Sequence, residues 1–290
     1  MAATVSAEER RAPAAATARR NRRRRLGDRL VGWALGTVTA LVFLALYAPI
    51  LIVFLLSFFR LRRGKVVWDS FSLDWYVDLF ANAQIGEALV NSLVVGFVSV
   101  FAAIVMAMAI AFWVDARPTS RAAGAIQFVV FLPFLLPPII TGLSLLIGFK
   151  EVGISRGLAT VMVGHTVFVL AMVYRTILTR LQSLSKSLVE ASLDLGATRL
   201  QTFRYVLLPN LRMAVVTAAL LAFALSFDET MITLFLVGDT STLPVRLYAM
   251  MRVGFTPEIN ALVTLILVFS IVLTLAIARV VGGRAEDLSV

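Results

Sequence analysis

EASLDLGATRLQTFRYVLLPN, residues 190–210, is a polar and basic stretch near the middle of a chain that is otherwise mostly apolar. The chain has 290 residues, of which 60% are hydrophobic and only 15% are charged. An ordinary soluble domain is about half apolar and about one quarter charged. The composition therefore predicts a membrane protein, and the quoted stretch stands out as a segment that lies outside the apolar layer.

Apolar runs long enough to cross a bilayer as helices divide the chain. Six such runs cover residues 31–59, 88–114, 122–149, 158–179, 213–237 and 259–281. They predict an all-α membrane protein with six transmembrane helices in one domain, residues 30–283. A basic tail, residues 1–29, precedes this domain, and a short tail, residues 284–290, follows it; the first tail is expected to be disordered.

The distribution of lysine and arginine predicts the orientation of the spans. If both termini are cytoplasmic, most of the 27 basic residues fall on the cytoplasmic side, as the positive-inside rule requires. The densest run, residues 18–25, is compatible with nucleic-acid or lipid binding, but an apolar segment follows it directly. We therefore expect a tail that orients the first helix, with the lipid bilayer as partner and no nucleic acid. The stretch between the fourth and fifth runs is then cytoplasmic.

Local signals divide residues 187–209 into a hairpin of two short helices. Ser187 and Glu190 have the spacing of a capping box, which starts a helix. Gly196 follows where a left-handed residue ends one. Thr198 begins a second capping box, and Pro209 is expected to end the second helix. One face of the first helix is small and mildly apolar, and it carries Leu188, Ala191, Ser192 and Leu195. That face suits a groove on another protein, although a connector lying on the lipid headgroups has the same features.

The hairpin resembles the EAA signature of the permeases of ABC importers. That signature reads E-A-A, three residues, G, nine residues, I-x-L-P. Here the matching residues are Glu190-Ala191-Ser192, Gly196 and Val206-Leu207-Leu208-Pro209. The resemblance implies that the hairpin couples the spans to a cytoplasmic ATPase. The residues that take this role are Glu190, Ala191, Ser192, Leu195, Gly196 and Pro209.

Three further segments resemble the second permease of spermidine/putrescine importers. They are LPFLLPPIITGLSLL (132–146), SFDETMITLFLVG (226–238) and TLPVRLYAMMRVGFTPEINAL (242–262). The resemblance implies a multi-pass subunit of the bacterial inner membrane that imports a polyamine. It also implies a second homologous permease, two ATPase subunits and an extracytoplasmic substrate-binding protein as partners. Other substrates of the same class stay open: an amino-acid derivative, an opine, a phosphonate or a metal chelate.

Polar residues inside the apolar runs are candidates for the translocation pathway, because charge inside a membrane usually has a function. Asp228 and Glu229 lie within the fifth run. On a continuous helix, Glu229 shares one face with Ser226, Thr230 and Thr233, so it is predicted to face the pathway. Asp228 lies off that face and is predicted to bond to a neighbouring helix or a gate. Alternatively, both carboxylates only hold helices together.

Prolines interrupt the third run at Pro133, Pro137 and Pro138, with Thr141 close behind. Each proline removes a helical hydrogen bond. A freed carbonyl cannot face lipid, so the break either lines a cavity at Pro137, Pro138 and Thr141 or is a buried structural kink.

The sequence shows no catalytic or metal-ligating cluster and no phosphate-binding G-x-x-x-x-G-K-[ST] loop. We therefore expect no enzyme activity and no cofactor on this chain, with ATP and Mg²⁺ on a partner ATPase. The alternative class is a proton-coupled secondary transporter that uses Glu229 or His165, the only histidine. For His165, hydrogen bonding between helices is the expected role.

Overall fold

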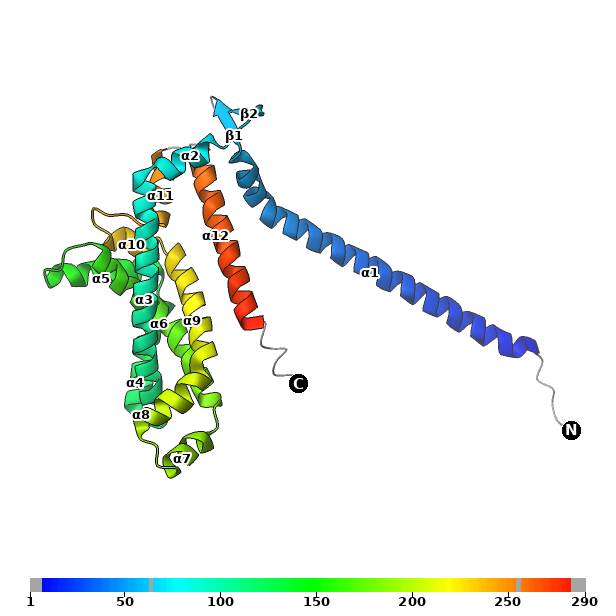
Figure 1. The fold of residues 1–290 in the computed structure, drawn as a ribbon. Coiled ribbons are helices and arrows are strands. Elements are labelled where there is room, and N and C mark those ends of the chain that lie inside the picture. Colours follow the sequence, from blue (N-terminus) through cyan, green and yellow to red (C-terminus); the bar gives the residue numbers. More distant parts are fainter. Residues whose placement is uncertain (1–6, 63–64, 254–256, 283–290) are drawn as a thin grey trace. The chain divides into compact units, whose positions relative to one another are not determined.

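The computed structural model describes residues 7–62, 65–253 and 257–282, and the backbone of most of them is helical (Figure 1). The chain divides into two units, residues 1–56 and residues 57–290. The first unit is the long helix α1 (Ala7–Leu56). From Ala7 onward the tail lies within α1, and its alanines and arginines favour a helix. The disorder expected for residues 1–29 stays a prediction. Residues 1–6 and 284–290 lie outside the described residues.

The second unit begins with a short antiparallel pair, β1 (Phe59–Arg62) and β2 (Lys65–Phe71). This β-hairpin was not predicted and is the one strand pair in the described part of a mostly helical fold. Aromatic and β-branched residues favour strands, and Phe59 packs edge-on against Trp68 across the pair with ring centroids 5.3 Å apart. Arg60 forms an ion pair with Asp74 at the start of the next helix.

Helices make up the rest of the second unit. They are α2 (Asp74–Ala81), α3 (Ala83–Asp115), α4 (Arg121–Leu135), α5 (Pro138–Glu151), α6 (Leu158–Ser183), α7 (Lys186–Asp194), α8 (Arg199–Gln201), the π-helical turn η1 (Thr202–Leu207), α9 (Leu208–Asp228), α10 (Met231–Leu236), α11 (Leu243–Val253) and α12 (Pro257–Gly282). Within this unit, α7 lies at the opposite end of the α3–α6–α9 bundle from α2 and α11 (Figure 1).

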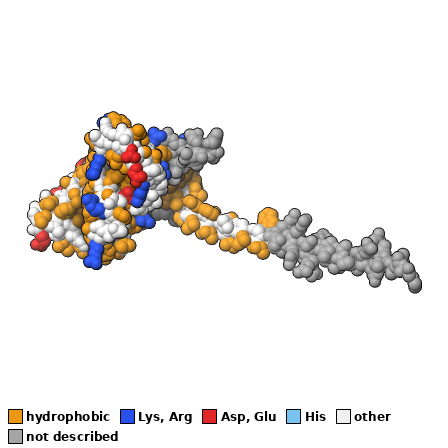
Figure 2. Space-filling model, turned by 90° about the horizontal axis from the view of Figure 1, so that it is seen from below, with side chains coloured by type: hydrophobic (Ala, Val, Ile, Leu, Met, Phe, Trp, Pro, Cys, Tyr) orange, Lys and Arg blue, Asp and Glu red, His pale blue; other side chains and the backbone are white. Residues whose placement is uncertain are grey.

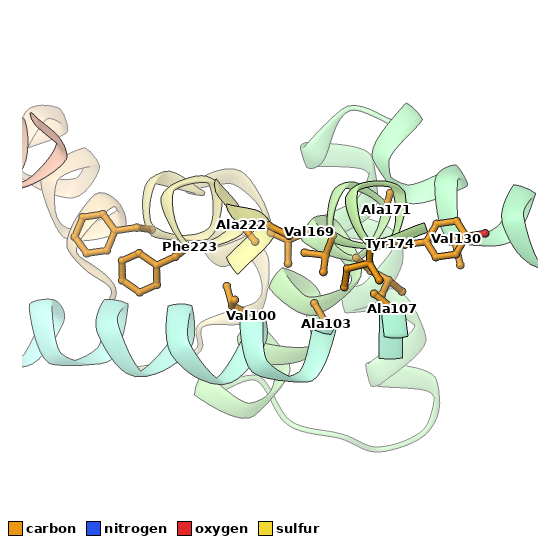
Figure 3. Packing of buried hydrophobic residues seen from close by; sticks show 14 of the residues in the cluster. Val100, Ala103, Ala107, Val130, Val169, Ala171, Tyr174, Ala222 and Phe223 are labelled. Carbon is orange, nitrogen blue, oxygen red and sulfur yellow. The ribbon is translucent and has the colours of Figure 1, made fainter. Parts of the chain in front are cut away.

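Helices α3, α6 and α9 form the centre of the bundle, and α3 packs most extensively against α6. Small side chains make this possible: Ala103 and Ala107 of α3 are fully buried and lie beside Val169 and Tyr174 of α6 (Figure 3). Small residues let helix backbones approach closely, which is how helices associate where lipid removes the hydrophobic drive between them.

Four of the described helices are long and apolar enough to cross a membrane: Val31–Leu56, Ala83–Asp115, Leu158–Ser183 and Arg199–Asp228. Helices α4 and α5 together make a fifth span if the bent pair is counted as one. The described part of α12 holds a shorter apolar helix, Glu258–Val272.

The third apolar run is broken by a 111° bend, so it is not a straight span. A residue that precedes proline is forced into extended backbone, and here Leu136 and Pro137 both precede one. Their ψ angles are 144° and 136°, and Pro138 then starts α5. Pro137 cannot bond to the carbonyl of Pro133, and the Thr141 hydroxyl donates to that carbonyl instead at 3.4 Å. Thr141 thus has a structural partner at the break.

The broken third and fifth runs meet where α5 packs against α10. A Cβ added to Gly142 of α5 would lie 3.0 Å from Ile232 Cα, which is a backbone atom of α10. At Gly148, further along the same helix, an added Cβ would meet nothing within 4 Å. Gly142 therefore sets how closely the two half-helices approach.

Replacing Gly142 with alanine is expected to destabilise the protein by about 1–3 kcal/mol, the usual cost of overpacking. Gly148→Ala is the matched control, because both changes improve helix propensity equally but only the first meets a neighbour. The readout is the midpoint of thermal unfolding in mild detergent. Equal midpoints for the two variants would contradict the close packing of α5 on α10.

Candidate functional site

The hairpin after α6 consists of α7 and a tight turn. Gly196 has a φ of +84°, the left-handed conformation that its position predicts. The Gly196 amide donates to the Leu193 carbonyl at 2.9 Å, and the Ala197 amide donates to the Ser192 carbonyl at 3.1 Å. These two bonds form a Schellman motif, and they close the C-terminus of α7.

The start of α7 differs from the sequence prediction. Helix α7 begins at Lys186 with Ser185 as its N-cap, so the capping box of Ser187 and Glu190 is wrong. The Ser187 hydroxyl is within 2.5 Å of the Ser185 hydroxyl. Because the helix starts before Ser187, Glu190 lies too far into it to reach the capping residue. The Glu190 side chain is exposed, and it has no hydrogen bond or ion pair within the part of the chain that the structure describes.

The second half of the hairpin is also not a separate helix. The capping box of Thr198 and Gln201 is confirmed, with bonds of 2.7 and 3.3 Å. The prediction that Pro209 ends this helix is wrong, because α8, η1 and α9 continue from Arg199 to Asp228. The Leu208 amide bonds to the Phe203 carbonyl, five residues back, and this wider π-turn makes room for the proline ring.

Contacts between the two halves hold the hairpin in shape. The Ser192 hydroxyl of α7 is 2.9 Å from the Thr202 hydroxyl of η1. The Arg180 guanidinium of α6 donates to the Asn210 carbonyl of α9 at 3.3 Å. The first bond ties α7 to the turn before α9, and the second ties α9 to α6.

The surface of the hairpin is more apolar than a solvated connector. Leu195 is 88% exposed and Leu200 is 74% exposed, and Leu188, Leu193, Ala191 and Tyr205 are also exposed. Seen from this end of the second unit, lysine and arginine side chains are scattered among hydrophobic ones (Figure 2). Exposed apolar side chains grouped on one element mark an interaction surface.

The second candidate region is an acidic turn between α9 and α10, residues 228–230. Here the expected continuous helix is wrong, because Glu229 has a ψ of 112° and the helix restarts at Met231. The shared polar face of Ser226, Glu229, Thr230 and Thr233 is therefore wrong too. Ser226 and Thr233 are buried, whereas Glu229 and Thr230 are partly exposed.

The two carboxylates have different surroundings. Glu229 Oε1 accepts from the Ile232 amide at 3.0 Å, which caps the start of α10. Asp228 is exposed at the end of α9, so the prediction that it bonds to a neighbouring helix gains no support among the described contacts. The role of either carboxylate in a pathway stays a prediction.

His165 of α6 is buried and bonds to both sides of the turn. Its Nδ1 is 2.8 Å from the Ser226 hydroxyl, and its Nε2 is 2.7 Å from the Thr233 hydroxyl. The expected hydrogen bonding of His165 between helices is confirmed. Its partners Ser226 and Thr233 were not predicted. The signal that could have indicated them was the presence of a single histidine and two hydroxyl side chains within apolar runs. Among the described residues, no group of acidic or histidine side chains could hold a metal ion.

The arrangement of helices is that of ABC importer permeases. A structure described as inward-facing conformations of the MetNI methionine ABC transporter matches 69% of this chain and 95% of its own, with a TM-score of 0.58 and 23% identity. A bacterial ABC transporter involved in alginate import matches 87% of this chain and 97% of its own, with a TM-score of 0.66 and 16% identity. At these identities the likeness shows the fold.

The family follows from the sequence comparisons. Residues 99–286 match the binding-protein-dependent transport system inner membrane component. The chain is 34% identical over 235 residues to the spermidine/putrescine transport system permease protein PotC of Haemophilus influenzae, covering 80% of this chain and 90% of that protein. It is 35% identical over 237 residues to the putrescine transport system permease protein PotI of Escherichia coli, covering 79% and 84%. The chain therefore belongs to the inner-membrane permeases of binding-protein-dependent transport systems.

Proposed function

We propose that this chain is the permease subunit of an ATP-driven importer that passes a polyamine, putrescine or spermidine, from a binding protein into the cytoplasm. The observation that carries the proposal is the exposed hairpin, which the Schellman turn at Gly196 closes. It occurs in a chain that shares about one third of its residues with polyamine permeases over most of its length. Two carboxylates at the acidic turn suit a cationic substrate.

The proposed topology has six spans, with both termini and the hairpin in the cytoplasm. The spans are the four long helices, the bent pair α4–α5 and α12. The basic residues Arg180, Lys186, Arg199 and Arg204 at the hairpin end support this orientation. The proposed complex adds a second homologous permease, two ATPase subunits that hold ATP and Mg²⁺, and an extracytoplasmic binding protein.

The first test is purification of the tagged chain from native membranes in mild detergent. We expect an ATPase and a second permease to co-purify, and we expect cells that lack the chain to lose uptake of radiolabelled putrescine or spermidine. A chain that purifies alone, even after gentle cross-linking, would contradict the importer. Uptake that persists without ATP but stops when the proton gradient is collapsed would favour a secondary transporter instead.

A further inference from the structure

The acidic turn lies in a helix that breaks without help from proline or glycine. Residues 226–233 read SFDETMIT, and neither residue occurs among them. Even so, the backbone is extended at Glu229, and α10 starts afresh at Met231. Local sequence alone therefore does not account for the break, and tertiary contacts have to hold it.

His165 makes those contacts on both sides. Ser226 is near the end of α9 and Thr233 is within α10, so the two hydroxyls bonded to the ring belong to different half-helices. In a continuous helix, residues seven apart are separated by about 10.5 Å along the axis. That separation exceeds the reach of one imidazole ring and its two hydrogen bonds, so this pairing requires the break.

The direction of the hydrogen bonds follows from the donors available. The Thr233 hydroxyl donates its one hydrogen to the Glu229 carbonyl, 3.0 Å away, which can only accept. Thr233 must then accept from His165, so Nε2 carries the ring proton. In a neutral imidazole, Nδ1 is then the acceptor and the Ser226 hydroxyl donates to it. The bonds form one chain that runs from Ser226 through His165 and Thr233 to the Glu229 carbonyl.

This chain of bonds ends on the residue that forms the turn. Glu229 is held at its carbonyl by Thr233 and at its carboxylate by the Ile232 amide. Other bonds fasten only the α10 side to α6: the Gly157 amide and the Thr160 hydroxyl donate to the Leu236 carbonyl at 2.8 and 2.9 Å. Among the described residues, His165 is the one side chain of α6 that bonds to both α9 and α10.

We infer that His165 is a positioning residue. Because its ring bonds to both α9 and α10, it holds the two half-helices in their present arrangement. This arrangement sets the direction in which Asp228 and Glu229 point from the acidic turn. His165 does not itself touch the substrate in this inference, because it is buried and both ring nitrogens are occupied. Loss of the two His165 hydrogen bonds should reorient the turn, while the rest of the bundle stays packed through the contacts of α3 with α6.

The test uses the absence of cysteine from the chain. Asp228→Cys introduces one thiol at the turn, and Leu195→Cys introduces one at the exposed hairpin as a reference. The rate of modification by a bulky maleimide is measured on the full chain purified free of its ATPase, which would otherwise cover position 195, with and without His165→Leu. His165→Leu removes two hydrogen bonds, and the loss of even one neutral bond is enough for a change of several-fold in a local equilibrium. We therefore expect the rate at position 228 to change by at least roughly 2- to 10-fold, while the rate at position 195 is unchanged.

Two further variants separate positioning from general loosening. Ser99→Ala removes a buried bond to the Met162 carbonyl of α6 outside the broken helix, and it should leave the rate at position 228 unchanged. His165→Gln, whose amide can still reach Thr233, should restore part of the wild-type rate. An unchanged rate in His165→Leu, or equal changes at both cysteines or in Ser99→Ala, would overturn the inference.

Transport gives a second readout, and only this part rests on the proposed function. With wild-type residues at 195 and 228, His165→Leu is expected to raise the KM for putrescine uptake more than it lowers the maximal rate. The labelling experiment needs no substrate, so its result does not depend on the proposed function. If putrescine is not the substrate, the wild type itself will show no putrescine uptake. If His165→Leu has the same KM as the wild type and position 228 is labelled at the same rate in both, the positioning role of His165 is contradicted.

Discussion

Replacing Gly196 with valine is expected to reduce uptake by at least about tenfold. Gly196 has a φ of +84°, and an ordinary L-residue pays about 1–2 kcal/mol in that conformation, with a β-branched residue worse. Because about 1.4 kcal/mol corresponds to a factor of ten, the ratio of closed to open turns would fall by roughly tenfold. The two bonds that close α7 would then be lost, and so would the orientation of the exposed Leu195.

The measurements are putrescine uptake in cells and the amount of ATPase that co-purifies with the chain. Gly153→Val is the matched control: Gly153 also has a positive φ, +75°, with nothing within 4 Å of an added Cβ, but it lies between α5 and α6. The control should lower thermal stability while the ATPase still co-purifies. If Gly196→Val shows wild-type uptake and a normal amount of co-purified ATPase, the hairpin does not couple the spans to the ATPase.

Glu229→Gln is expected to reduce polyamine uptake by roughly 10- to 100-fold while the complex still assembles. Hydrogen bonds to a charged group contribute about 1.5–3 kcal/mol, and a neutral amide would lose that advantage with a cationic substrate. The glutamine oxygen can still accept from the Ile232 amide, 3.0 Å from the present carboxylate, so the cap of α10 is kept. The variant therefore tests the charge and not the turn.

Asp239→Asn is the control, since Asp239 is an exposed carboxylate ten residues further along, beyond α10. Kinetics of putrescine uptake are compared for both variants and for Asp228→Asn. A deficit in Asp228→Asn with normal uptake in Glu229→Gln would assign the pathway to the exposed carboxylate instead. If neither variant affects uptake, both carboxylates have a structural role only.

Several features could be predicted from sequence because their causes are local. A left-handed glycine after an apolar turn predicts a helix C-cap, and Gly196 forms one. Consecutive prolines force extended backbone on the residues before them, and the third run breaks at Leu136–Pro137. The long apolar runs predict membrane-crossing helices, and four of them have that length and composition.

Other features escaped prediction because they depend on neighbours. Pro209 stops a helix in local terms, yet the π-turn before it lets α8 and α9 continue as one element. The prediction that Ser226, Glu229, Thr230 and Thr233 share one face required a regular helix. The helix is instead broken at Glu229, and His165 bonds to both sides of the break. No proline or glycine inside residues 226–233 marks that break, and His165, which bonds to Ser226, lies 61 residues earlier in the chain.

The sequence by itself thus determined the membrane class, the apolar spans and the tight turn of the hairpin, because composition, periodicity and backbone sterics act over short distances. The family followed from the resemblance of its motifs to those of known permeases. Tertiary structure alone decided how the broken third and fifth runs face each other at Gly142 and which carboxylate is exposed. Those outcomes depend on close backbone approach and on hydrogen bonds between residues far apart in the chain. In the membrane interior no water replaces a lost backbone hydrogen bond, so a broken helix needs such partners from the rest of the protein.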